Sequence, residues 1–358
     1  MYRKIMGFLE AWKENEHRKP LILQGARQVG KTYSILEFGR IHYENVAYFN
    51  FETNPKLNET FEEKISPDYL IPILSHIAGQ TIVKEKTLIV FDEVQLCERA
   101  LTSLKYFCED APDYHIIVAG SLLGVAVNRA KFSFPVGKVD MKTLYPMDME
   151  EFMIAVGEDE LVEQIKKCFE TNRPMPSALH DAAMQLYRQY LVVGGMPECV
   201  MQFVQTGDYI LIRHTQDTIL TSYLNDMGKY NNLNEIKKTR LAYDNITVQL
   251  SKKNTRFQYK LIKKGGRASE FENAIEWLCL SGIVSQVYRV EQIKKPLENY
   301  RDIDAFKIYV SDLGLLCAKK DLAANDILYM VEELNDFKGG MTENYVNVHL
   351  LLGIRAWG

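Results

Sequence analysis

The sequence predicts an α/β fold whose first part is a parallel sheet covered by helices. Three apolar stretches support this: Pro20–Gln24 precedes a glycine-rich turn, Thr87–Phe91 precedes two acids, and His115–Gly120 precedes a serine. Strands of a parallel sheet are buried on both faces and therefore form nearly continuous apolar runs. Ligands of open α/β folds bind at the carboxyl ends of such strands, so we expect the functional residues there.

Length and composition limit the classes of protein to consider. With 358 residues and an apolar share of 47%, the chain is long enough for two or three globular domains. Its net charge of -4 and its pI near 6.0 give no overall signature of a protein that binds nucleic acid or a membrane surface. Binding of that kind would therefore depend on a local patch of charge.

The cysteines and the N-terminus indicate a cytoplasmic protein with no membrane partner. The cysteines lie far apart and form no C-x-x-C pair, which argues against a disulfide framework and a zinc site. The first residues, MYRKIMGFLEAWKENEHRKP, lack the apolar core of a signal peptide. No later run approaches the roughly 18 apolar residues of a membrane span. The cysteines, all expected to be reduced, are Cys97, Cys108, Cys168, Cys199, Cys279 and Cys317.

The turn after the first strand matches the phosphate-binding pattern G-x-x-x-x-G-K-[ST], and helical sequence follows it over 32–41. Glycines let the backbone turn so that successive N–H groups point at phosphate oxygens, and the helix N-terminus adds its dipole. We expect Lys31 to reach the β- and γ-phosphates and the Thr32 hydroxyl to hold Mg²⁺. A simple strand-to-helix turn is the alternative. The predicted nucleotide-binding residues are Gly25, Ala26, Arg27, Gln28, Val29, Gly30, Lys31, Thr32 and Tyr33.

The acids that end the apolar run 87–91 predict the catalytic part of the same site. We expect Asp92 to bind Mg²⁺ through its water shell, and Glu93 to orient and deprotonate the water that attacks the γ-phosphate. Two solvated acids after a strand are the alternative. Gln95 and Arg99 line the site or lie on the surface. Because no N-K-x-D or T-K-x-D segment follows a later strand, ATP is favoured over GTP by elimination, and the expected cofactors are ATP and Mg²⁺.

One further strand, together with the apolar stretch from His115, completes the prediction. Residues 45–52 form one candidate, followed by helical sequence near 68–79, and 115–121 form the other. In P-loop proteins a strand inserted between the phosphate-loop strand and the acidic strand often carries a polar residue that senses the γ-phosphate. Ser121 is the candidate for this catalytic role, with a helix N-cap as the alternative. The sequence does not identify an arginine finger; Arg129 is the best local candidate.

The ordered motifs RKPLILQGARQVGKT, LIVFDEVQ, HIIVAGSLLG, FPVGKVDMKTLYPMDMEEF, LVVGGMPECV, FKIYVSDLGLL and GGMTENYVNVHLL resemble those of uncharacterised prokaryotic AAA-type ATPases with a C-terminal domain of unknown function. The resemblance runs along the whole chain. It implies an AAA-like P-loop ATPase core over 1–156, a helical connector over 157–228, a winged-helix-like domain over 229–320, and over 321–358 the start of an incomplete α/β region similar to PD-(D/E)xK nucleases.

The sequence departs from that family at two places. Gly137-Lys138 stands where members often have Gly-Arg, so a phosphate-sensing arginine is not carried over to this position. Glu343 matches the early acid of the nuclease-like pattern, but the further strand with Glu-Val-Asp and the later lysine are not present. One carboxylate does not hold a catalytic metal, so we expect a truncated nuclease-like domain without nuclease activity.

A basic segment precedes the expected third helix of the winged-helix-like region. Residues 229–267 carry eight Lys and three Arg against two acids, a net charge of +9. The third helix is expected over Ala268–Ser281, and the wing strands over 283–290 and 305–310. The acidic face of this helix argues against reading of base sequence in the major groove. Contact with the nucleic-acid backbone is expected from Lys252, Lys253, Lys263, Lys264 and Arg267, the alternative being a solvated face or a docking surface for an acidic domain.

Two functions follow from these features. The first is a Mg²⁺-dependent ATPase that couples its nucleotide state to domain movement and acts on nucleic acid. The second is a slowly hydrolysing signalling switch whose C-terminal region is a protein-interaction module. A small-molecule kinase is disfavoured, because such enzymes need a lid with arginines and commonly lack the adjacent Asp-Glu pair.

Overall fold

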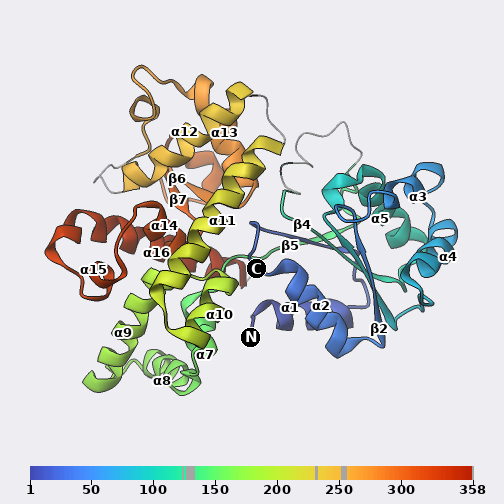
Figure 1. Cartoon of the computed structure of the whole chain (residues 1–358), viewed down its shortest axis with the longest axis horizontal. Helices are drawn as coiled ribbons and strands as arrows, with labels where there is room; N and C mark the ends of the chain where they lie inside the picture. Colours follow the sequence, from blue (N-terminus) through green and yellow to red (C-terminus); the bar gives the residue numbers. More distant parts are fainter. Residues whose placement is uncertain (123–124, 126–133, 230–232, 251–255, 357–358) are drawn as a thin grey trace. The chain divides into compact units, whose positions relative to one another are not determined.

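The computed structural model describes every residue except 123–124, 126–133, 230–232, 251–255 and 357–358. The chain divides into two compact units (Figure 1): an N-terminal unit, Arg3–Leu144, and a C-terminal unit, Tyr145–Gly358 with Met1–Tyr2. The division falls at Leu144, whereas the sequence placed it at residue 156. The reason is that Met147 belongs to the later helices: its amide donates to the carbonyl of Gly195 at 2.7 Å, and its carbonyl accepts from the Tyr190 hydroxyl at 2.8 Å.

The N-terminal unit contains a five-stranded parallel sheet in the order β2-β3-β4-β1-β5. The strands are β1 (Leu21–Gln24), β2 (Asn45–Asn50), β3 (Thr87–Asp92), β4 (His115–Gly120) and β5 (Asp140–Thr143). Every residue of β3 and β4 is buried, as expected for central strands of a covered sheet. β4 lies between the phosphate-loop strand β1 and the acidic strand β3, which confirms the inserted strand predicted from the sequence.

Helices cover both faces of this sheet (Figure 1). On one face lie α1 (Ile5–Glu14) and α2 (Lys31–His42), and on the other α3 (Leu57–Glu63), α4 (Pro67–Ala78) and α5 (Glu98–Asp110), with the short 3-10 helix η1 (Val94–Leu96) before α5. A cluster of buried aromatic rings lies between the sheet and the helices α3, α4 and α5. In this cluster Phe91 contacts Phe49, Phe51 and Phe61 edge to face. α4 has Pro67 in its first turn and stops at Gly79 in the left-handed conformation, two ordinary helix boundaries.

The register of the strands brings the predicted site residues to one edge. Gln24 at the end of β1 pairs with Gly120 and with Thr143, and Asn50 at the end of β2 pairs with Asp92. The residues that follow these strands therefore leave the sheet side by side at its carboxyl edge. The sheet itself, not any single loop, aligns the phosphate loop, the acids and Ser121.

The C-terminal unit begins with helices, as the helix-rich composition predicted. These are α7 (Met149–Ala155), α8 (Asp159–Glu170), α9 (Ser177–Val193), α10 (Pro197–Thr206) and α11 (Tyr209–Lys229). The Gly194-Gly195-Met196-Pro197 segment ends α9 and starts α10, with Pro197 in the first turn of the new helix. Within the described residues, no helix is both long enough and apolar enough to pass through a membrane.

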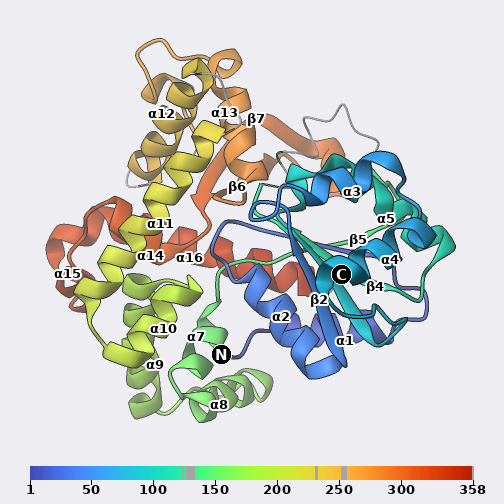
Figure 2. The same ribbon diagram turned by 45° about the vertical axis from the view of Figure 1, so that its right-hand side comes forward.

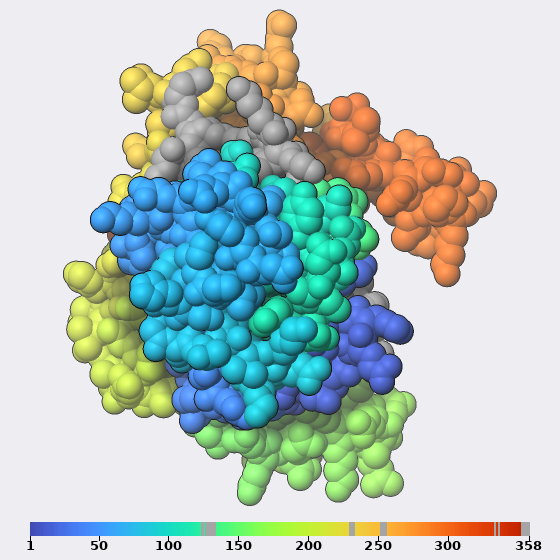
Figure 3. All heavy atoms as spheres, turned by 90° about the vertical axis from the view of Figure 1, so that its right-hand side faces the viewer, coloured from blue at the N-terminus to red at the C-terminus, as the bar shows by residue number. Residues whose placement is uncertain are grey.

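An antiparallel hairpin with helices beside it follows (Figure 2). The elements are α12 (Leu233–Leu250), the 3-10 helix η2 (Tyr259–Leu261), α13 (Ala268–Leu280), β6 (Val284–Val290), the 3-10 helix η3 (Leu297–Tyr300) and β7 (Arg301–Val310). The expected third helix and first wing strand are present, and the tip of the hairpin forms a protruding lobe (Figure 3, orange). The second strand starts at Arg301, not at residue 305, because pairing continues past an irregularity at Tyr288 and Arg289.

The remaining elements are helical: α14 (Leu313–Lys319), α15 (Ala324–Leu328), the 3-10 helix η4 (Glu332–Leu334) and α16 (Asn335–Ala356). The sequence suggested the start of an α/β region over 321–358, but the described part of that range holds no strand of its own. Instead α16 packs on β7, where the buried Asn344 side chain accepts from the amide of Val310 at 2.8 Å and donates to its carbonyl at 2.9 Å. The pair satisfies the last backbone groups of the strand.

A buried carboxylate joins the glycine segment after α9 to the end of β7. Asp312 caps α14 by accepting from the amide of Leu315 at 2.8 Å, and it accepts from the amide of Gly195 at 2.6 Å. A Cβ on Gly195 would lie 2.0 Å from the carbonyl oxygen of Met147, so only glycine fits there. Burial raises the pKa of Asp312 to about 6, although its backbone hydrogen bonds act in the opposite direction.

Candidate nucleotide-binding site

The phosphate-loop segment forms a tight turn between β1 and α2. Gly25 and Gly30 have φ angles of 147° and 90°, which residues with a side chain rarely adopt. A Cβ on Gly25 would lie 2.1 Å from the carbonyl oxygen of Leu144, the residue after β5. The loop therefore passes against the neighbouring strand end, and its path depends on the absence of a side chain at Gly25.

The loop lysine bonds to the loop itself. Its ammonium donates to the carbonyl oxygens of Gly25 and Ala26, both at 2.8 Å, and Lys31 is 7% exposed. These two carbonyls hold the positive charge inside the turn, where phosphate oxygens would be its alternative acceptors. A second cation stabilises the loop from the N-terminal segment: Arg3, which is buried, donates to the carbonyl of Val29 at 2.9 Å.

The Thr32 hydroxyl and the Asp92 carboxylate lie in direct contact. Thr32 Oγ1 donates to Asp92 Oδ2 at 2.9 Å, and the amide of Glu93 donates to Asp92 Oδ1 at 3.0 Å. The hydroxyl of Tyr48, on β2, also donates to Asp92 Oδ2, at 2.7 Å. The two residues predicted to hold Mg²⁺ are 60 positions apart in the chain and meet because β1 and β3 end at the same edge.

Glu93 follows directly in an unusual backbone conformation. Its φ angle is 51°, in the left-handed region, and its carboxylate accepts a short hydrogen bond from the side-chain amide of Gln95. Burial raises the pKa of Glu93; the bond from Gln95 opposes this shift, and the neighbouring charge of Asp92 adds to it. A carboxylate with a raised pKa is a stronger proton acceptor than an exposed glutamate.

The other predicted residues divide between the site and the surface. Ser121 follows β4 at the same edge and is 8% exposed, whereas the Arg99 guanidinium donates to the carbonyl of Phe61 in α3. Lys138 forms an exposed ion pair with Glu109 at 2.9 Å. Arg129 lies outside the described residues. Tyr33 is 56% exposed on the first turn of α2, and the side chains of Arg27 and Gln28 are half-buried.

Sequence reasoning missed two side chains of β2. Tyr48 contacts Asp92 directly, and the side-chain amide of Asn50 donates to the Tyr48 hydroxyl at 3.1 Å. Their signal in the sequence is their spacing, because residues two apart on a strand share a face and alternate with the buried Ala47 and Phe49. Tyr48 is 38% exposed, and partial burial of its phenol raises its pKa to about 12. Like any tyrosine hydroxyl, it is protonated and able to donate at neutral pH.

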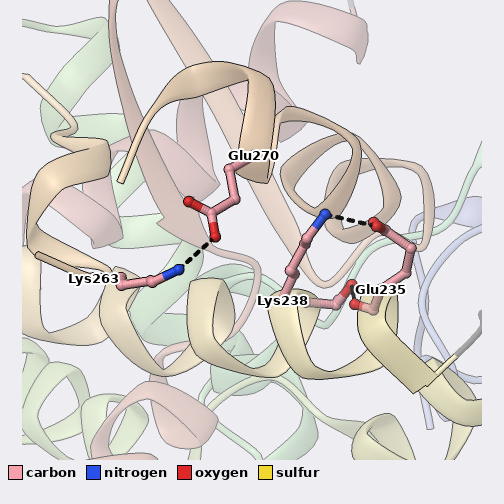
Figure 4. Close-up of polar contacts among 5 residues, drawn as sticks. Glu235, Lys238, Lys263 and Glu270 are labelled. Atoms are coloured by element: carbon pink, nitrogen blue, oxygen red, sulfur yellow. Dashed lines mark hydrogen bonds and ion pairs between the residues drawn. The ribbon is translucent and has the colours of Figure 1, made fainter. Parts of the chain in front are cut away.

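In the basic segment of 229–267, acids neutralise part of the positive charge (Figure 4). Lys263 pairs with Glu270 of α13 at 2.9 Å, and Lys238 pairs with Glu235 at 2.8 Å. Lys264 and Arg267 are exposed, while Lys252 and Lys253 lie outside the described residues. Of the five residues predicted to contact the nucleic-acid backbone, the structure thus describes three, of which Lys263 is paired with an acid and Lys264 and Arg267 are exposed near the start of α13.

The acid expected from the nuclease-like pattern is bound by β7. Glu343 on α16 accepts from the ammonium of Lys307 and from the hydroxyl of Tyr309. Within the described part of the chain, no group of three or more His, Cys, Asp or Glu side chains is arranged to hold a metal ion. All six cysteines are free in the structure. In this structure Glu343 connects α16 to the hairpin.

Comparison with known proteins gives two family matches. Residues 17–153 match the model of an AAA domain, and residues 184–326 match that of a domain of unknown function (DUF8612). No curated protein matches the chain. The first match covers the sheet, the phosphate loop and the acids, so this region is similar to AAA domains.

Several solved structures resemble the chain at low identity. The ORC2 protein of Aeropyrum pernix has a TM-score of 0.40 and 11% identity, with 95% of this chain and 95% of that chain covered. The RuvB Holliday junction branch migration motor of Thermotoga maritima has a TM-score of 0.35 and 15% identity, with 79% and 88% covered. The A. pernix ORC1 protein in complex with DNA has a TM-score of 0.30 and 11% identity, with 89% and 91% covered.

Proposed function

We propose that this protein is a Mg²⁺-dependent ATPase that couples its nucleotide state to movement of the C-terminal unit, and the match of residues 17–153 to an AAA domain supports the proposal. The observation that carries the proposal is the convergence of Thr32, Asp92 and Glu93 beside the phosphate loop. Coupling is supported by the connection between the units. The chain leaves the N-terminal unit at Leu144, whose amide donates to the carbonyl of Gln24 at 2.8 Å, immediately before the loop.

Hard oxygen donors at this edge fit magnesium. The Thr32 hydroxyl and the Asp92 carboxylate would hold the ion, the carboxylate through its water shell, and the phosphates of the nucleotide would complete the site. Bound Mg²⁺ would neutralise the charge that develops on the phosphate oxygens.

The remaining residues act on the phosphates and on water. The loop amides and the N-terminus of α2 cradle the phosphates, and the Lys31 ammonium exchanges the carbonyls of Gly25 and Ala26 for phosphate oxygens. Glu93 accepts the proton of the attacking water and is oriented by Gln95. Ser121, directly after the inserted strand β4, would contact the γ-phosphate.

Two substitutions test the site. Lys31→Ala is expected to abolish ATP binding, because the loop loses the charge that faces the phosphates. Glu93→Gln is expected to retain ATP while turnover falls about 10²- to 10⁴-fold, the usual contribution of a general base. Equilibrium ATP binding and steady-state phosphate release measure both effects. Lys138→Ala, which removes an exposed lysine of the same unit, is the control; undiminished turnover in both site variants would contradict the assignment.

We further propose that nucleic acid is what the C-terminal unit acts on, through its phosphate backbone. The exposed side chains of Lys260, Lys264 and Arg267 support this, as does the hairpin that follows α13 in the order expected of a winged helix. Turnover measured with and without DNA tests the idea, and stimulation that weakens with salt is expected. Tight ATP binding with slow turnover that DNA leaves unchanged would favour a nucleotide switch whose C-terminal unit binds a protein.

A further inference from the structure

The Asp92 carboxylate receives more hydrogen bonds than a phosphate-loop site by itself requires. Its Oδ2 atom accepts from Thr32 Oγ1 at 2.9 Å and from the Tyr48 hydroxyl at 2.7 Å, and its Oδ1 atom accepts from the amide of Glu93. Asp92 is 4% exposed, so few water molecules reach it. Three protein donors therefore determine the orientation of this carboxylate.

The Tyr48 hydroxyl is itself held in place. It accepts from the side-chain amide of Asn50 at 3.1 Å, while the side-chain oxygen of Asn50 accepts from the amides of Glu52 and Thr53, both at 2.9 Å. The phenolic proton is therefore directed at Asp92. A continuous path of hydrogen bonds runs from the turn after β2 to the carboxylate at the end of β3.

We propose that Tyr48 is a positioning residue for magnesium, which holds the Asp92 carboxylate in the orientation in which it receives the metal–nucleotide complex. This inference rests on the proposed function of the site. Thr32 and the amide of Glu93 are parts of the phosphate-loop and acidic motifs, whereas Tyr48 comes from the neighbouring edge strand. Hydrogen-bond partners behind metal-binding groups orient them and strengthen their binding, and their loss typically costs about 10- to 100-fold in metal affinity.

The test is Tyr48→Phe, which removes only the hydroxyl. Binding of a non-hydrolysable ATP analogue is titrated with Mg²⁺ at equilibrium, so that no turnover is needed. The Mg²⁺ concentration at half-maximal enhancement of binding is expected to rise about tenfold or more. Affinity for the same analogue in EDTA is expected to stay within about twofold of the wild type, because the phosphate loop is untouched.

Tyr69→Phe is the matched control. Its hydroxyl donates to the Glu63 carboxylate at 2.6 Å, so the substitution removes the same kind of hydrogen bond between α4 and α3 of the same unit, among residues that are not part of the candidate site. A Mg²⁺ midpoint for Tyr48→Phe within twofold of the wild type, or an equal shift in Tyr69→Phe, would overturn the role of Tyr48 and leave the proposed function intact. If Mg²⁺ does not change the affinity of the wild type for the ATP analogue, both the role of Tyr48 and the proposed function are wrong.

Discussion

Replacing Gly25 by alanine is expected to weaken both the fold of the N-terminal unit and nucleotide binding. The added Cβ would lie 2.1 Å from the carbonyl oxygen of Leu144, and the two atoms must separate by a further 1.3 Å to reach ordinary contact at 3.4 Å. Leu144 is not free to retreat, because its amide donates to the carbonyl of Gln24 at 2.8 Å. Overpacking of this kind costs about 1–3 kcal/mol and the φ of 147° adds about 1–3 kcal/mol of strain.

The expected decrease is therefore about 2–6 kcal/mol in the free energy of unfolding, a large part of the roughly 5–15 kcal/mol of a typical domain. Urea unfolding and equilibrium ATP binding measure the two effects. Gly79→Ala is the control: its φ is also positive, at 65°, but a Cβ there meets nothing within 4 Å. The free energy of unfolding of the Gly79→Ala variant should therefore be lower than that of the wild type by only about 1–2 kcal/mol. If Gly25→Ala is no less stable than Gly79→Ala and binds ATP normally, the argument from the loop geometry is refuted.

Two other predictions concern the C-terminal unit. The pKa of Asp312 is about 6 in the folded state against an ordinary value of 3.8, so the protonated carboxyl contributes about 3 kcal/mol of stability that is present below pH 4 and disappears as the pH rises through 6. The variant Asp312→Asn should lack this pH dependence of the free energy of unfolding, which urea unfolding at several pH values measures. If the free energy of unfolding depends on pH as strongly in the variant as in the wild type, the prediction is wrong. Charge reversal at Lys260, Lys264 and Arg267 should weaken the salt dependence of DNA binding. The slope of the logarithm of the binding constant against the logarithm of the salt concentration should fall by about one for each phosphate that the variant no longer binds, and an unchanged slope would exclude this surface as the DNA-binding site.

The parts of the fold that the sequence predicted correctly depend on short-range patterns. The turn from Gly25 to Thr32 is specified by residues within one loop, and β3 and β4 are recognisable because central parallel strands are apolar throughout. Even the position of β4 between β1 and β3 was predictable, since the order of strands in P-loop folds constrains it. The structure of residues 321–358 was not predictable in the same way, because α16 packs on β7 through Asn344 and Val310, which are 34 positions apart in the chain.

The phosphate loop, the pair of acids and the basic segment can all be recognised in the sequence, because each is encoded by neighbouring residues. The side chains that surround them depend on how the chain folds. Tyr48 reaches Asp92 across 44 residues, and Asp312 reaches the amide of Gly195 across 117. Lys263 is partly neutralised by Glu270 of the next helix. Hydrogen bonds and ion pairs act over about 3 Å, so they depend on which strands and helices become neighbours, and no local pattern of residues encodes that choice.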